Sequence, residues 1–124
     1  MPSRILVVDD DPDILKAIGL RLRLSGFNVS AAQDGVSATQ LAMSSRPDVV
    51  ILDIGMPAGD GHQVCERLRA HPKTCEIPII YVTARDTGTD RKKAAEMGAL
   101  AYIVKPFQHQ ELMATVNRAL TPLS

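Results

Sequence analysis

Short runs of apolar, largely β-branched residues recur along this chain, and segments with a helical period separate them. The strong runs lie at residues 5–8, 49–52, 77–82 and 100–104, and a weaker, alternating run lies at 27–31. Strands that are apolar at nearly every position are typical of a parallel sheet covered on both faces. The weaker run indicates a strand at or near the edge of that sheet.

Apolar side chains recur at helical spacing between these runs. The first helix is expected to follow an Asp11 cap, with Pro12 at its first position, and to stop at Gly26. The other helices are expected at residues 38–42 (ending before Pro47), 64–68 (ending before Pro72), 86–97 and 112–120. Strand and helix alternate five times, which predicts an α/β domain with right-handed crossovers.

The size and charge of the chain exclude several classes of protein. Its 124 residues fit one domain, residues 1–124, and its 14 basic and 14 acidic residues give a formal net charge of zero. Neutrality argues against direct binding of nucleic acid through the bulk surface. The apolar runs are far shorter than the ~20 residues of a membrane span, and residues 1–4 show no secretory signal. We therefore expect a cytoplasmic protein without a membrane segment, with Cys65 and Cys75 as reduced thiols.

Polar side chains follow four of the predicted strands at the point where each strand ends. They are the aspartates 9–11, Asp53, Thr83 and Lys105. Ligands of open parallel sheets bind outside the carboxyl ends of the strands, so these side chains are expected to meet at one edge.

This set of side chains suits a particular chemistry. Asp9, Asp10 and Asp53 would repel one another without a cation, and carboxylates without His or Cys favour Mg²⁺ over Zn²⁺. A lysine and a hydroxyl nearby would neutralise a phosphoryl group during its transfer. A carboxylate can itself accept that group. The residues thus predict metal-assisted phosphoryl chemistry on an aspartate.

Four segments carry a resemblance to a known family. In chain order they read ILVVDDDP, VVILDIGMPAGDG, PIIYVTA and GALAYIVKPF. Together they resemble the receiver domain of two-component response regulators of the chemotaxis-regulator-like kind. The resemblance implies a flavodoxin-like, doubly wound parallel sheet of five strands in the order 2-1-3-4-5, flanked by five helices. It implies a signalling phosphoacceptor rather than an enzyme, with a sensor histidine kinase or histidine phosphotransfer protein as donor and a downstream protein target or output domain as receiver of the signal.

The resemblance also implies roles for the acidic residues. Asp53 would be the phosphoacceptor. Asp10 would ligate Mg²⁺ directly, and Asp9 would bind it through water or support its ligands. The third protein ligand would be the backbone carbonyl of Gly55, a position whose missing side chain leaves the acceptor unshielded from water.

Further roles fall on the last two strands. Thr83 would hydrogen-bond one phosphoryl oxygen, and Lys105 would pair with another. Tyr102 occupies the position of the switch aromatic, which would enter the space that Thr83 leaves. Pro106 would follow a cis peptide bond. Arg85, two residues past the threonine, could lie over the phosphoryl group and alter its lifetime.

Other functions are open from the residues alone. A haloacid-dehalogenase-like phosphatase also uses a strand-end aspartate and Mg²⁺, but it requires a second aspartate where this chain has Gly55. A receiver-like scaffold that accepts no phosphoryl group is the third possibility. The basic residues 91–93 form either a solvated helix face or a contact for an acidic partner. No output domain is visible in the sequence, so the chain is either a single-domain regulator or a piece of a longer one.

A zinc site is the remaining alternative. Its ligands would be His62, Cys65, His71 and Cys75. The first two could share a helix face, but Pro72 breaks the helical geometry between the two pairs. Zinc is therefore disfavoured.

Overall fold

The protein is represented by a computed structural model that describes residues 2–56 and 61–121. Residue 1, residues 57–60 near the end of the second motif, and residues 122–124 lie outside the described part. The strands are β1 (Arg4–Val8), β2 (Asn28–Ala32), β3 (Val49–Leu52), β4 (Ile79–Thr83) and β5 (Ala101–Val104). The helices are α1 (Pro12–Leu24), α2 (Gly35–Ser45), α3 (Gly61–Ala70), α4 (Gly88–Glu96) and α5 (His109–Leu120).

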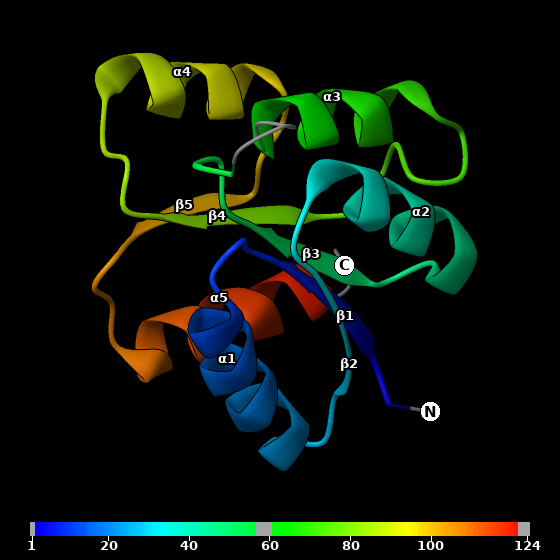
Figure 1. Cartoon of the computed structure of the whole chain (residues 1–124), viewed down its shortest axis with the longest axis vertical. Coiled ribbons are helices and arrows are strands. Elements are labelled where there is room, and N and C mark those ends of the chain that lie inside the picture. Colours follow the sequence, from blue (N-terminus) through cyan, green and yellow to red (C-terminus); the bar gives the residue numbers. More distant parts are fainter. Residues whose placement is uncertain (1, 57–60, 122–124) are drawn as a thin grey trace.

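The strands form one parallel sheet in the order β2-β1-β3-β4-β5. This order is the predicted one, and the weak strand β2 lies at an edge as expected. Val8 pairs with Leu52, and Thr83 pairs with Val104, so neighbouring strands end level with one another. The residues that follow the strands are therefore delivered to the same edge of the sheet (Figure 1).

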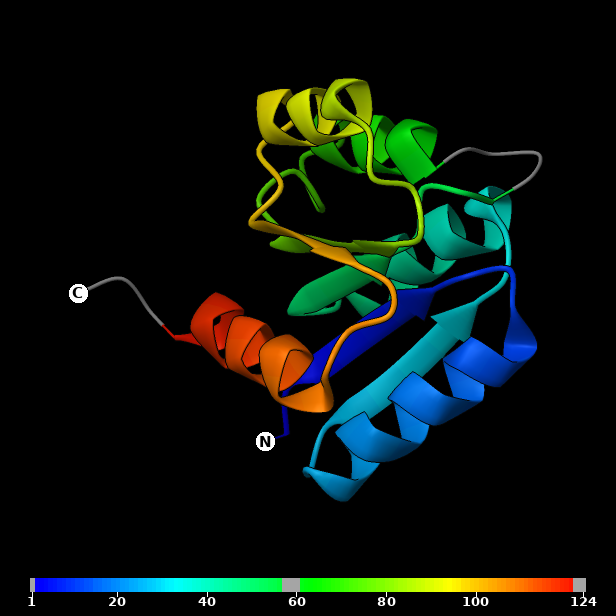
Figure 2. The ribbon, with the colours of Figure 1, turned by 90° about the vertical axis from the view of Figure 1, so that its left-hand side faces the viewer.

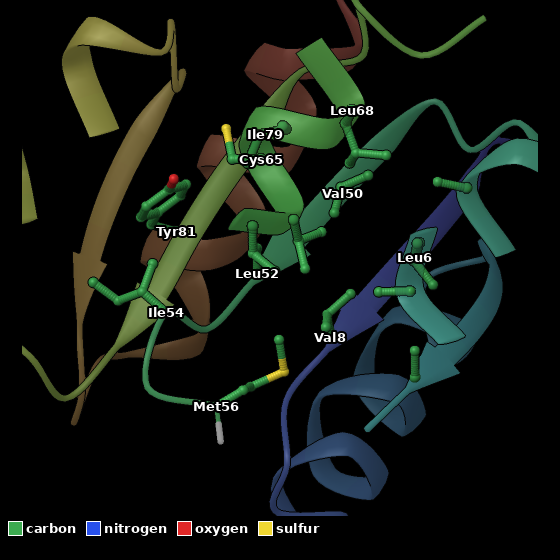
Figure 3. Packing of buried hydrophobic residues seen from close by; sticks show 14 of the residues in the cluster. Leu6, Val8, Val50, Leu52, Ile54, Met56, Cys65, Leu68, Ile79 and Tyr81 are labelled. Atoms are coloured by element: carbon green, nitrogen blue, oxygen red, sulfur yellow. The ribbon is translucent and has the colours of Figure 1, made fainter. Parts of the chain in front are cut away.

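Helices cover both faces of the sheet. Helices α1 and α5 lie on one face, and α2, α3 and α4 lie on the other (Figures 1 and 2). Successive strand residues point to opposite faces, so each strand contributes to two cores. Strand residues facing α2, α3 and α4 include Leu6, Val8, Val50, Leu52 and Tyr81 (Figure 3). Those facing α1 and α5 include Ile5, Val7, Ile51, Ile80 and Val82.

The first helix begins and ends as the sequence predicts. The Asp11 side chain accepts a hydrogen bond from the N–H of Asp13 (2.9 Å), and Pro12 opens the helix. Gly26 follows the helix with a φ of 95°, a conformation that other residues adopt only with strain.

Several boundaries differ from expectation by one to three residues, and two of these differences have a clear physical cause. Strand β4 begins at Ile79 rather than Ile77, because Pro78 has no N–H to donate to a neighbouring strand. Helix α4 begins at Gly88 rather than Asp86, because Thr87 has an extended backbone and its side chain accepts the N–H of Asp90 (3.0 Å). Within the described part of the chain, no helix is long and apolar enough to cross a membrane.

Helix α4 is attached to the domain by few apolar contacts. Its buried residues are only Asp90 and Ala94. At its carboxyl end, Arg69 of α3 donates from Nε to the carbonyl of Met97 (2.9 Å) and from Nη2 to that of Gly98 (3.2 Å). The same guanidinium donates from Nη1 to the carbonyls that precede β4, those of Cys75 (3.0 Å) and Ile77 (2.7 Å). One arginine therefore joins the connections that lead into β4 and β5.

Candidate functional site

The predicted site residues meet at the carboxyl edge of the sheet. They are Asp9 and Asp10 after β1, Asp53 after β3, Thr83 at the end of β4 and Lys105 after β5. The N–H of Asp53 donates to the carbonyl of Val8 (3.0 Å), which continues the pairing of β1 with β3. The N–H of Lys105 donates to the carbonyl of Thr83 (2.8 Å) and holds β5 against β4 in the same way.

The three carboxylates converge. Asp9, Asp10 and Asp53 each offer an oxygen, and these oxygens lie within 4.8 Å of one another. In the described residues, this is the one such group of three or more metal-binding side chains. Asp9 and Asp53 are buried, whereas Asp10 is exposed. Oxygen ligands with one side open to water match the preference of Mg²⁺, which keeps several of its waters. The residues present therefore fit this ion.

Lys105 holds two of the carboxylates together. Its Nζ lies 2.7 Å from Asp9 Oδ2 and 3.2 Å from Asp53 Oδ2. Burial lowers the pKa of Lys105, but the two carboxylates outweigh burial and raise it, so the ammonium stays charged. Burial raises the pKa of Asp9, against the effect of Lys105 and of the N–H of Asp11. The bond from Lys105 to Pro106 is cis, as the sequence resemblance implied.

Thr83 and Tyr102 both contact the backbone of Arg85. Thr83 is buried, and its Oγ1 accepts a hydrogen bond from the N–H of Arg85 (3.2 Å). The Tyr102 hydroxyl donates to the carbonyl of Arg85 (2.6 Å). The Tyr102 ring is half-buried, with its centroid 5.8 Å from that of Tyr81, and burial raises the pKa of its hydroxyl. The two predicted switch residues are thus linked through one peptide segment.

Two glycines border Asp53. A Cβ on Gly61 would collide with the backbone of Asp53 and Ile54, so only glycine allows α3 to begin this close to Asp53. A Cβ on Gly55 would lie 3.4 Å from Asp53 Oδ1, an ordinary contact. The N–H of Gly55 donates to that same oxygen (2.8 Å). The role of the Gly55 carbonyl as a metal ligand stays a prediction.

The structure also contains a polar cluster that sequence reasoning missed. Asp90 of α4 is buried and accepts hydrogen bonds from His62 Nε2 (3.0 Å), Thr87 Oγ1 (2.8 Å) and the guanidinium of Arg85. His62 Nδ1 lies 3.2 Å from the Tyr81 hydroxyl, so each ring nitrogen of this histidine contacts a group outside the ligand set of the zinc alternative. The three-residue spacing of Thr87 and Asp90 is typical of a helix cap. This spacing was the one feature of the sequence that could have pointed to the cluster.

A parallel α/β sheet with carboxylates, a hydroxyl and a lysine at its carboxyl edge defines a class of proteins, the flavodoxin-like signalling modules that carry a phosphoryl group. The family model for the response regulator receiver domain matches residues 5–117. The chain belongs to the family of response regulator receiver domains. It is thus the phosphoacceptor domain of a two-component response regulator, and the phosphatase alternative is not favoured.

Curated relatives are longer than this chain. Response regulator MprA of Mycobacterium sp. (strain KMS) is 42% identical over 120 residues, which are 97% of this chain and 51% of that protein. The DNA-binding dual master transcriptional regulator RpaA of Synechocystis sp. is 38% identical over 117 residues, 94% of this chain and 48% of that protein. The chain spans about half the length of the curated relatives it matches.

Solved structures share the whole fold. Chemotaxis protein CheY4 of Vibrio cholerae is 29% identical, with a TM-score of 0.91 over 97% of this chain and 100% of that chain. The receiver domain of sensor histidine kinase PA1611 from Pseudomonas aeruginosa is 31% identical, with a TM-score of 0.86 over 95% and 97%. In that protein a magnesium ion is coordinated in the active site cleft. The predicted fold and family are confirmed.

Proposed function

We propose that Asp53 is the phosphoacceptor and that its donor is a phosphohistidine of a sensor histidine kinase or a histidine phosphotransfer protein. The observation that carries this proposal is the 3.2 Å contact between Lys105 Nζ and Asp53 Oδ2. Through this contact a charged ammonium lies next to the carboxylate of Asp53. Negative charge would accumulate there during transfer of the phosphoryl group, and the ammonium would stabilise it. The downstream partner is a protein target or an output domain.

In the proposed reaction, a carboxylate oxygen of Asp53 forms a bond to phosphorus as the bond from phosphorus to the imidazole nitrogen breaks. The imidazole leaves with the electron pair of that bond. Lys105 pairs with one phosphoryl oxygen, and the Thr83 hydroxyl donates a hydrogen bond to another. Bound Mg²⁺, held by Asp9, Asp10, Asp53 and the carbonyl of Gly55, would supply charge neutralisation for the phosphoryl oxygens.

In this proposal the domain promotes only its own phosphorylation and dephosphorylation, so it acts on no separate substrate. The cytoplasm remains the expected compartment. RpaA is named as DNA-binding, but about half of that protein lies outside the match. The prediction of no direct nucleic acid binding therefore concerns only residues 1–124.

Intact-mass spectrometry tests the acceptor. With Mg²⁺ and acetyl phosphate, the wild-type chain should gain the mass of one phosphoryl group, and Asp53→Asn should gain none. Asp48→Asn is the matched control, because Asp48 lies before β3 at the opposite end of the same strand. A wild-type chain without an adduct, or an adduct that persists in Asp53→Asn, would overturn the assignment.

A further inference from the structure

A buried carboxylate lies near the acceptor without belonging to the acidic site. The Asp90 residue is 5% exposed, and its oxygens accept hydrogen bonds from three side chains of different chemistry. These are His62 of α3, Thr87 at the start of α4 and Arg85 in the connection before α4. Burial raises the pKa of Asp90, but these hydrogen bonds outweigh burial and lower it. Asp90 is therefore a fixed negative charge.

The contact with Arg85 involves both oxygens of Asp90. Arg85 Nη2 lies 3.0 Å from Oδ1, and Arg85 Nε lies 3.2 Å from Oδ2. Two parallel hydrogen bonds of this kind fix the plane of a guanidinium as well as its position. His62 lies between Asp90 and the Tyr81 hydroxyl, which orients the carboxylate from its buried side.

The stem of Arg85 passes beside the acceptor. Its Cδ lies 3.8 Å from the position that a Cβ on Gly55 would occupy, and Asp53 Oδ1 lies 3.4 Å from the same position. Its Nη1 donates to the carbonyl of Ile54, the residue after the acceptor (3.4 Å). The side chain is 47% exposed, so the guanidinium has room to turn. Arg85 is within reach of two anions: the carboxylate that it binds and the acceptor beside its stem.

We infer that Asp90 is a positioning residue that holds the Arg85 guanidinium away from Asp53 and competes with the aspartyl phosphate for it, which limits the lifetime of the phosphoryl group. The inference rests on the proposed function of Asp53. A phosphoryl group offers the same paired oxygens as a carboxylate, so one guanidinium cannot satisfy both at once. The stronger Asp90 holds Arg85, the less Arg85 protects the phosphoryl group from water.

Beryllium fluoride with Mg²⁺, a stable mimic of the phosphoryl group, tests this competition on the full chain. Asp90→Asn should bind the mimic about tenfold more tightly than wild type, equivalent to about 1.4 kcal/mol, and its phosphorylated form should decay more slowly. In an Arg85→Ala background, the same Asp90→Asn change should alter neither quantity. Asp86→Asn is the matched control, because Asp86 lies in the same connection as Arg85 and the change removes only an exposed ion pair with Arg91 of α4.

A structural role for Asp90 would give a different pattern. Weaker or unchanged binding in Asp90→Asn, or an equal change in both backgrounds, would overturn the inference. A second measurement needs no variant: the side-chain NMR signal of Arg85 Nε in the wild type should shift when the mimic binds. If the wild type binds the mimic and this signal does not change, the inference about Asp90 is wrong, but the proposed function of Asp53 still stands. A wild type that binds no mimic would remove the proposed function as well.

Discussion

Asp9 and Asp10 are consecutive in the sequence, but the fold gives them different environments. Both oxygens of Asp9 already accept hydrogen bonds, Oδ1 from the N–H of Asp11 (3.0 Å) and Oδ2 from Lys105 (2.7 Å). Asp10 is exposed. A hydrated ion can therefore approach Asp10 without displacing a protein donor, whereas Asp9 must share its oxygens with Lys105.

This difference predicts unequal effects on magnesium binding. Asp10→Ala should abolish the binding of Mg²⁺, and Asp9→Ala should weaken it less, because Asp9 supports the site from its buried side. An NMR titration with MgCl₂ measures both affinities. Asp13→Ala, an exposed aspartate of the following helix, should bind like wild type. If Asp10→Ala bound Mg²⁺ with the affinity of the wild type, the assignment of Asp10 as the direct ligand would be wrong.

Gly55 gives a second prediction at this scale. Gly55→Ala should fold normally, because the added Cβ meets Asp53 Oδ1 and Arg85 Cδ only at ordinary contact distances. The methyl group should partly exclude water from the acceptor and slow the loss of the phosphoryl group several-fold. Decay of the phosphorylated chain, followed by intact mass, gives the rate. Gly88→Ala, where an added Cβ meets nothing within 4 Å, is the control. Equal decay of Gly55→Ala and wild type would contradict the prediction.

Sequence reasoning could predict Asp53, Thr83 and Lys105 because each follows or ends an apolar strand, and parallel strands end at one edge. It could not predict the contact of His62 with Asp90. These residues lie 28 positions apart on separate helices, and neither interrupts a pattern. Their contact depends on how α3 and α4 pack side by side on the sheet, which no local spacing encodes.

Among the helices, the ones with a continuous apolar face were the easiest to predict. Helix α1 buries Leu15, Ile18 and Leu22 on one side and has a cap at its start. Helix α4 buries one apolar side chain, Ala94, so its start is decided by the Thr87 cap rather than by burial. Polar contacts decide where such a helix begins. Because several residues of the 86–90 segment could have served as the cap, the sequence alone could not show which one does.

The cap of α2 predicts a measurable dependence of stability on pH. Asp34 accepts the N–H and the hydroxyl of Ser37 (2.8 and 3.1 Å), and these hydrogen bonds lower its pKa below 3.8. A lowered folded-state pKa contributes stability above pH 3.8 that is lost as the pH falls through the folded value. Asp34→Asn keeps a capping side chain that does not titrate.

The free energies of unfolding of the wild type and of Asp34→Asn, measured in urea, should therefore differ most above pH 3.8. The advantage of the wild type over Asp34→Asn should shrink below that pH. Ser37→Ala removes the hydroxyl donor but leaves the backbone donor. The stability of this variant, which keeps Asp34, should therefore depend on pH less than that of the wild type. An advantage of constant size on both sides of pH 3.8 would contradict the assignment.

At the scale of the whole molecule, phosphorylation of the proposed acceptor Asp53 would have to change a surface that a partner can read. Thr83 and Tyr102 hold the backbone of Arg85 from either side, and the Arg91 guanidinium lies 4.8 Å from the centre of the Tyr102 ring. A hydrogen bond from Thr83 to a phosphoryl oxygen would disturb this segment first. A bias of about 1–3 kcal/mol between two arrangements is enough to change partner affinity by one to two orders of magnitude.

Backbone amide NMR with beryllium fluoride and Mg²⁺ tests this route. Shifts should extend from Thr83 through the start of α4 to Tyr102, well beyond the acidic residues. Residues at the opposite end of the sheet, such as Asn28 and Asp48, serve as internal controls and should not shift. Changes confined to the neighbours of Asp53 would leave phosphorylation without a path to the surface.

The two ends of α4 are held to the rest of the domain by different contacts. The Arg69 guanidinium binds the carbonyls of Met97 and Gly98 at one end of the helix, while Asp90 and Arg85 join the other end to the phosphoacceptor region. With the carboxyl end of α4 held by Arg69, a rearrangement near Asp53 that loosens the contacts of Asp90 would move the amino end more than the carboxyl end. A partner that touches the first turn of α4 would sense the phosphoryl group strongly, whereas one bound at the last turn would meet almost the same surface in both states.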